Sequence, residues 1–156
     1  MTSEREVLDA LQVRYGDRVG DAYRWAYAEH VPFDRALRAK GSTRIADAIA
    51  VDCWSSKGME IHGHEVKVSR SDWLAELRVP DKAEAFRPFV DRWWLVVPDL
   101  TIVRDDLPAG WGLMLTNGQA TQVIRRAPRL MPAPMHRAML AGLLRATAKT
   151  AMRRTP

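Results

Sequence analysis

Two neighbouring stretches decide the fold: residues 44–51 read RIADAIAV, and residues 59–68 read MEIHGHEVKV. From Ile45 to Val51 the first stretch is almost continuously small and apolar, which is typical of a strand covered on both faces. The second stretch alternates with a period of two residues and predicts a strand with two different faces. One face carries Ile61, Gly63, Glu65 and Lys67, and the other carries His62, His64, Val66 and Val68.

Helices and further strands are expected on both sides of these two strands. Ser3 and Glu6 have the spacing of a capping box and predict a helix over 3–14, and a second helix is expected over about 20–30. Residues 34–43 are expected to form a loop. Beyond the two strands, the pattern predicts helices over 72–77, 82–90 and about 135–152, a buried strand over 93–97, and a hairpin of strands 111–115 and 121–124. This order describes an α/β fold, a mixed β-sheet flanked by helices.

The composition fits a single domain of ordinary size, with 156 residues of which 47% are apolar and 28% charged. The domain is expected to span residues 1–156, with its core at about 20–128 and a basic helical segment at 129–156. No apolar run approaches the ~18 residues that a membrane-spanning helix needs. Cys53 is the single cysteine, which excludes an internal disulfide. These features predict a soluble, cytoplasmic protein with no membrane partner.

The positive charge is concentrated at the C-terminal end. Asp106 is the last acidic residue, and residues 107–156 hold eight basic side chains. The first 106 residues hold 16 basic and 19 acidic side chains. Such a division indicates a segment that meets a polyanion, most plausibly nucleic acid. The alternative that charge alone leaves open is a solvated basic helix that only aids solubility.

Charged residues inside the two apolar stretches are the candidates for chemistry. Asp47 stands in a segment that otherwise reads as buried, and an unpaired buried carboxylate costs several kcal/mol. Glu65 and Lys67 share one face of the next strand. Carboxylates on neighbouring strands suit Mg²⁺, which prefers oxygen ligands, and a lysine beside the ion can orient a water. The structural alternatives are a solvated Glu65–Lys67 ion pair and an Asp47 that pairs with Arg44 or Lys67.

Four motifs carry a resemblance to a known family: RIAD at 44–47, EVKVSRSDWL at 65–74, PDK at 80–82 and DRWWLVVP at 91–98. Together they resemble the MmcB-like DNA repair proteins, many of them carried by actinobacterial phages. These belong to the PD-(D/E)XK, or restriction-endonuclease-like, superfamily. The similarity covers about residues 22–128. It implies a restriction-endonuclease-like core that hydrolyses phosphodiester bonds.

The resemblance also implies roles for particular residues. Asp47, Glu65 and the main-chain carbonyl of Val66 are expected to hold Mg²⁺, for which Mn²⁺ can substitute, and Lys67 is expected to position a water. The superfamily has a further acid on its first core helix, and Glu29, placed on the expected helix over 20–30, is the candidate.

Further residues are candidates for contacts to DNA phosphates: Ser69, Arg70, Ser71, Lys82, Arg44, Arg125 and Arg126. For Ser71 the alternative reading, a helix cap, is favoured. Lys82 is expected either to reach a phosphate across the site or to pair with Asp81 or Glu84.

The function expected from the resemblance is a Mg²⁺-dependent DNA nuclease of repair, recombination or phage DNA metabolism in a bacterial cell. The alternative is a catalytically silent DNA-binding or scaffolding module on the same fold, and a third reading is a hydrolase of a non-nucleic phosphate. The apolar side of the last helix, which includes Met139 and Leu144, fits either the core or the seam of a homodimer.

Overall fold

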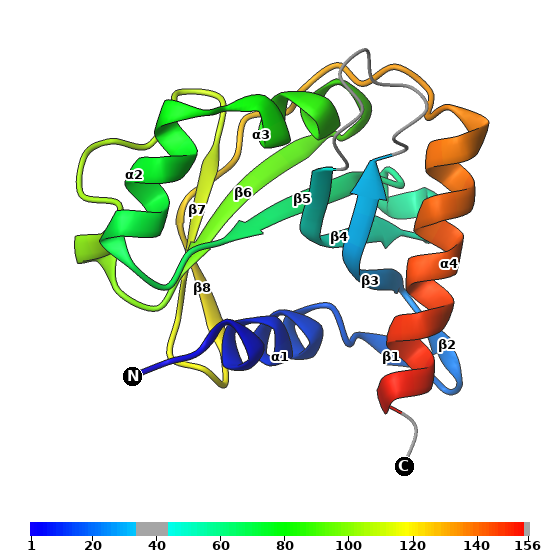
Figure 1. Ribbon diagram of the computed structural model, residues 1–156. Helices are drawn as coiled ribbons and strands as arrows, with labels where there is room; N and C mark the ends of the chain where they lie inside the picture. Colours follow the sequence, from blue (N-terminus) through cyan, green and yellow to red (C-terminus); the bar gives the residue numbers. More distant parts are fainter. Residues whose placement is uncertain (34–43, 155–156) are drawn as a thin grey trace.

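The computed structural model describes residues 1–33 and 44–154, except for the side chain of Asp81. The loop expected at 34–43 lies outside the described residues. The described part folds around a six-stranded sheet with the order β3-β4-β5-β6-β7-β8 (Figure 1). Its strands are β3 (Trp25–Phe33), β4 (Arg44–Asp52), β5 (Ile61–Val66), β6 (Arg92–Val97), β7 (Gly112–Thr116) and β8 (Thr121–Arg125). Strands β5, β6 and β7 run parallel and the other pairs are antiparallel, which confirms the expected mixed sheet.

Four α-helices surround the sheet: α1 (Glu4–Arg14), α2 (Arg70–Arg78), α3 (Asp81–Phe86) and α4 (Arg137–Arg154). The capping box of Ser3 and Glu6 starts α1 as expected. Short 3₁₀ turns lie at Ser55–Lys57, Arg87–Phe89 and Leu100–Ile102. No helix in residues 1–33 and 44–154 is long and apolar enough to cross a membrane.

The sheet separates two apolar cores. On one face, Trp73 of α2, Phe86 of α3 and Met139 of α4 pack against residues such as Trp93 of β6. On the other face, α1 buries its apolar side, including Leu8, against the sheet. The expected two-faced strand is confirmed, since Ile61 of β5 packs into the first core and Val66 and Val68 into the second. At Gly63 of the first face the Trp93 ring comes so close that a Cβ would lie 2.4 Å from it, so only glycine fits.

The helix expected over 20–30 is wrong. Residues Arg18–Val19 and Ala22–Tyr23 form a two-stranded hairpin, β1 and β2, and Trp25 begins β3. β3 pairs along its length with β4, from Trp25 with Asp52 to Phe33 with Arg44. The strand is thus formed by long-range pairing, which overrides a local alanine-rich sequence that favours a helix.

α4 closes the open edge of the sheet beside β3, as Figure 1 shows. The Thr150 hydroxyl accepts a hydrogen bond at 2.9 Å from the backbone N–H of Glu29, an edge group that would otherwise lack a partner strand. The end of α4 therefore belongs to the body of the domain.

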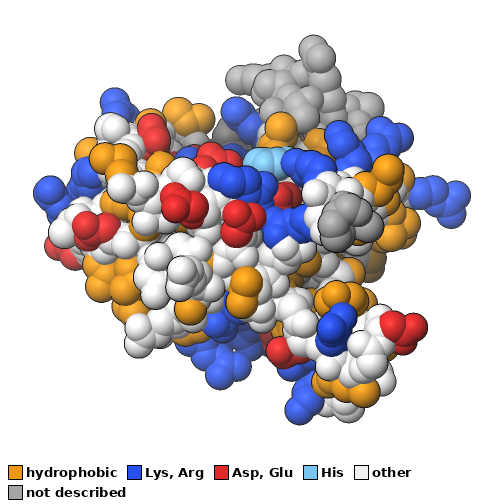
Figure 2. Space-filling model, turned by 90° about the horizontal axis from the view of Figure 1, so that it is seen from below, with side chains coloured by type: hydrophobic (Ala, Val, Ile, Leu, Met, Phe, Trp, Pro, Cys, Tyr) orange, Lys and Arg blue, Asp and Glu red, His pale blue; other side chains and the backbone are white. Residues whose placement is uncertain are grey.

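Seen from the side of α1, the surface of the molecule carries acidic and basic side chains gathered around a histidine (Figure 2).

Candidate active site

Strands β4 and β5 separate at Asp47. The last residue pair that they share is Ala48 with His64. Beyond this pair, the backbone N–H of Val66 donates to Oδ2 of Asp47 at 2.8 Å. Because the N–H and C=O of a strand residue point to the same side, the carbonyl of Val66 also faces Asp47. The structure thus brings the Asp47 carboxylate and the Val66 carbonyl together where the strands diverge.

Glu65 lies next to this point and has no exposed surface. Lys67 Nζ and Lys82 Nζ each lie 2.8 Å from its Oε1, and Lys82 Nζ also lies 3.4 Å from Oδ1 of Asp47. Lys67 contacts Glu76 of α2 at 3.3 Å. The second oxygen of Glu65, Oε2, is buried and has no hydrogen-bond partner among the described residues. Carboxylates and ammonium groups from four elements therefore form one largely buried network.

The network shifts the pKa values of its members. Burial raises the pKa of Glu65 to about 8, and the negative charge of Asp47 adds to this effect. Burial alone would lower the pKa of Lys82, but the carboxylates of Glu65 and Asp47 outweigh burial and raise it. Burial opposes a similar rise for Lys67, whose pKa is raised by Glu65 and Glu76. Both lysines are therefore cations at neutral pH, and their positive charges oppose the rise in the pKa of Glu65.

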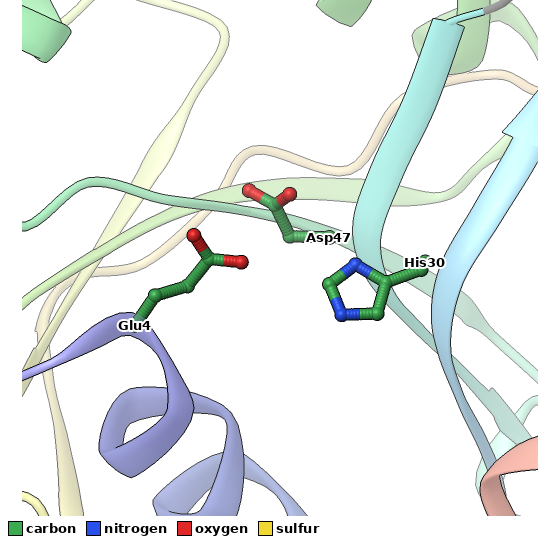
Figure 3. A group of neighbouring side chains, drawn as sticks. All are labelled: Glu4, His30 and Asp47. Carbon is green, nitrogen blue, oxygen red and sulfur yellow. The ribbon is translucent and has the colours of Figure 1, made fainter.

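Glu4 and His30 extend the site from Asp47 toward α1. Glu4 is the first residue of α1, and His30 lies across from Asp47 on β3. One ligand atom from each of the three side chains lies within 4.8 Å of the others, and the side chains point toward a common space (Figure 3). His30 has a φ of 53°, a left-handed conformation that costs a non-glycine residue on the order of 1 kcal/mol. Neither residue is marked by a motif; the signal for Glu4 is its place on the first helix, where the resemblance expects an acid.

The donor set fits a hard divalent cation. Asp47 and Glu65 offer carboxylate oxygens, Val66 a carbonyl and Glu4 a further carboxylate, and Mg²⁺ binds such oxygen ligands. The buried Oε2 of Glu65 is an acceptor without a donor in the described part of the chain. Buried acceptors are normally satisfied, so a cation would complete the coordination of this oxygen. Lys82 lies between the two carboxylates, and an ion bound by both would compete with its ammonium group.

Glu29 lies elsewhere. It belongs to β3, and its carboxylate is on the α1 face of the sheet, where it is almost fully buried. Arg5 donates to both of its oxygens, at 2.6 and 2.8 Å, and Arg154 and the Tyr27 hydroxyl also bind it. These arginines hold the pKa of Glu29 below its ordinary value even though burial acts in the opposite direction. Its expected place on a core helix is wrong, and its contacts tie α1, β3 and α4 together.

The segment after β5 has a different helix start from the one expected. Ser69, and not Ser71, is the N-cap of α2, since its hydroxyl accepts from the backbone N–H of Asp72 at 3.2 Å. Ser71 is exposed, with its Oγ 3.2 Å from Oγ of Ser69. The Arg70 guanidinium donates to the carbonyl of Ile102 and pairs with Asp106. Ser69 and Arg70 thus have structural partners already.

The remaining basic candidates divide in the same way. The guanidinium of Arg125, at the end of β8, donates to the carbonyls of Trp111 and Pro108, just before β7. Arg126 is exposed. Arg44 begins β4 at the edge of the described residues. Lys82 pairs with Asp47 and Glu65, and among the described side chains no ion pair joins it to Glu84.

A basic groove of about 570 Å³ lies between β3 and α4, and Glu29 and His30 line it on the β3 side. Arg145, Lys149 and Arg153 line it at four-residue spacing along one side of α4. All three are exposed, and none has an acidic partner in the described part of the chain. Basic side chains also lie beside the histidine in Figure 2. A row of unpaired cations therefore leads away from the cluster of Glu4, His30 and Asp47.

Comparison with known proteins places the chain in a family. The family model described as "DNA repair protein MmcB-like" matches residues 5–155, nearly the whole chain. The chain belongs to the MmcB-like family. The family name indicates a role connected with DNA. No curated protein matches the chain.

A solved structure shares the fold of this MmcB-like protein. It is a protein of unknown function from Silicibacter pomeroyi, with a TM-score of 0.63 and 23% sequence identity. The match covers 99% of this chain and 89% of that one. The similarity extends over the whole described architecture, and the six-stranded mixed sheet flanked by four helices is compatible with a restriction-endonuclease-like fold.

Proposed function

We propose that this MmcB-like protein is a Mg²⁺-dependent DNA nuclease of the PD-(D/E)XK type that acts in DNA repair, recombination or phage DNA metabolism. The observation that carries the proposal is Glu65, a fully buried carboxylate with an oxygen that lacks a partner among the described residues, beside Asp47 and two lysines. A DNA substrate would place the protein in the cytoplasm of a bacterial cell.

Each residue of the network has a task in this proposal. Asp47, Glu65 and the Val66 carbonyl would hold Mg²⁺, which when bound polarises the scissile phosphate and lowers the pKa of a bound water. Lys67, fixed between Glu65 and Glu76, orients the attacking water and offsets negative charge that develops on the phosphate. Glu4, on the first helix, takes the place that the sequence suggested for Glu29.

Lys82 has one role in the structure and a second role in the proposed reaction. In the structure its ammonium group neutralises Asp47 and Glu65. Its side chain is partly exposed and long, so on metal binding it is free to turn toward the substrate and bind a phosphate oxygen.

A catalytically silent DNA-binding module is the second candidate function, and one observation favours it. Lys67 and Lys82 already form ion pairs with the acidic residues of the network, so these charged side chains have partners without a metal. The basic groove along α4 serves either function, because phosphate contacts require no turnover.

The test is cleavage of a panel of labelled single-stranded, duplex, flap and four-way-junction DNAs with Mg²⁺, Mn²⁺ or EDTA. Wild type is compared with Glu65→Ala and Lys67→Ala, and with Glu84→Ala and Lys57→Ala as matched exposed acid and lysine controls. We expect metal-dependent cutting that is lost in the first two variants and kept in the controls. Binding without cutting in any metal, equal in all five proteins, would rule out the nuclease and leave the silent module.

A further inference from the structure

A second cavity lies at the opposite end of α1 from Glu4. It has a volume of about 410 Å³ and lies between the end of α1, the β2–β3 segment and the last turns of α4, which come together in Figure 1. Four aromatic residues line the cavity, namely Tyr15, Tyr23, Trp25 and Tyr27. The polar side chains of Gln12 and Arg154 also line it. No acidic residue of the described chain lines it.

The inner walls of this cavity are held in place. The ring of Tyr15 meets Trp25 edge-on at a centroid distance of 4.9 Å and stacks on Tyr27 at 6.1 Å. The Tyr15 hydroxyl lies 2.7 Å from Nε2 of the buried His64, and the Tyr27 hydroxyl donates to the carbonyl of Leu8 at 3.1 Å. The aromatic walls therefore form a preformed slot, which binds a planar ligand without a large cost in side-chain entropy.

The mouth of the cavity is formed by Tyr23, Gln12 and Arg154. Tyr23 is 56% exposed, and the guanidinium of Arg18 lies over its ring, 5.9 Å from the centroid. The Gln12 amide, half-buried in the wall, makes no hydrogen bond within the described residues. Arg154 is held at the rim by ion pairs with Glu29 and Asp9, whereas Arg18, beside Tyr23, has no acidic partner among the described residues. A largely exposed aromatic ring with a cation beside it and an amide without a hydrogen bond are groups that bind a base by stacking, by hydrogen bonds to its edge, and by attraction of its phosphate.

We propose that this cavity binds an unpaired nucleobase, and that its source is single-stranded DNA. A paired base is stacked in its duplex and cannot enter a slot, so the site would distinguish single strands or splayed ends from intact duplex. The slot and Glu4 are separated by the length of α1, whose 11 residues span about 16 Å. The proposal rests on DNA as the partner, taken from the proposed function, and it does not require catalysis.

The test measures binding in EDTA, where no cleavage occurs. Fluorescence anisotropy compares a labelled 12-nucleotide single strand with the corresponding duplex, and dAMP is added as a competitor to represent a free nucleotide. Quenching of tryptophan fluorescence, to which Trp25 contributes, is a second readout. The variants are Tyr23→Ala and Gln12→Ala; Tyr23→Phe, which keeps the ring, and Gln122→Ala, an exposed glutamine of β8, are the controls.

We expect Tyr23→Ala to weaken single-strand binding roughly tenfold, in line with the loss of one stacked base, and to leave duplex binding unchanged. Gln12→Ala should weaken it less, and the two controls should bind like wild type. Equal binding by all variants would overturn the proposal, as would an equal loss on duplex DNA. Competition by dAMP at the affinity of the strand would assign the slot to a free nucleotide and overturn the single-strand source. The nuclease can fail its own test while Tyr23 still governs single-strand binding, so the two results are separable.

Discussion

Lys82 shows how a single residue can make a buried acidic pair compatible with the fold. Two carboxylates in a largely apolar sheet would repel each other and lose their hydration. The ammonium group of Lys82, 3.4 Å from Asp47 and 2.8 Å from Glu65, offsets both effects. A divalent cation held by the same oxygens would have the same function. Lys82 and the metal are therefore alternatives for one place in the electrostatic balance.

Replacement of Lys82 by methionine should consequently strengthen metal binding. We expect Lys82→Met to lower the melting temperature in EDTA, because two carboxylates then face each other with less compensation. Its affinity for Mg²⁺, measured by calorimetry, should rise on the order of tenfold, which corresponds to ~1.4 kcal/mol of competition removed. Lys57→Met, at an exposed turn, is the matched control and should change neither quantity. Unchanged Mg²⁺ binding by Lys82→Met would show that Lys82 does not compete with the ion, and weaker binding would show that Lys82 supports it.

At the scale of secondary-structure elements, a sequence pattern predicts a strand correctly where the pattern arises from burial of that strand in the sheet. β4 and β5 were predicted because one is continuously apolar and the other alternates, and both patterns arise from burial in the sheet. The sequence of β3 locally favours a helix, whereas its strand conformation depends on pairing with β4 and on the contacts of Glu29 with Arg5 and Arg154. Such long-range contacts leave no periodic signal in a single sequence.

The same distinction applies to the candidate site. Asp47, Glu65 and Lys67 are candidates in the sequence because a charge inside an apolar strand is a local anomaly, and the family resemblance favours a metal site over an ion pair there. Glu4 and His30 are not candidates in the sequence, because an acid in a first helical turn is common, and nothing in the sequence shows that His30 lies across from Asp47. The place of Lys82 between two carboxylates depends on the position of α3 over β4, a tertiary feature.

The start of α2 offers a test of one local correction. Ser69 caps the helix through the N–H of Asp72, while Ser71, two residues later, is exposed. We expect Ser69→Ala to lower the free energy of unfolding by about 1 kcal/mol, the usual contribution of an N-cap serine. Ser71→Ala is the matched control and should change it by less than about 0.5 kcal/mol. Urea denaturation at neutral pH measures both, and a larger effect at Ser71 would return the cap to the position first expected from the sequence.

At the scale of the whole molecule, α4 has two faces with separate tasks. Its buried side, with Met139, Leu143 and Thr150, belongs to the domain and covers the edge of β3. Leu140 and Leu144 are exposed, so only part of the apolar side of the helix lies in the core. Truncation of residues 125–156 would consequently damage the fold. A test of the basic charge must replace surface side chains one by one.

The basic groove is expected to set the salt dependence of DNA binding. Each phosphate contact made by a lysine or arginine releases counterions, so the logarithm of the affinity falls with the logarithm of salt concentration in proportion to the number of contacts. The double variant Arg145→Gln with Lys149→Gln should therefore bind duplex DNA more weakly and with a slope shallower by roughly 1 to 2. Lys57→Gln with Arg104→Gln removes the same charge from exposed positions on other elements and should leave the slope nearly unchanged. Anisotropy titrations in EDTA from low to physiological salt give both slopes. Equal slopes for the two double variants would mean that only the net charge matters, and that α4 makes no specific contact with the DNA backbone.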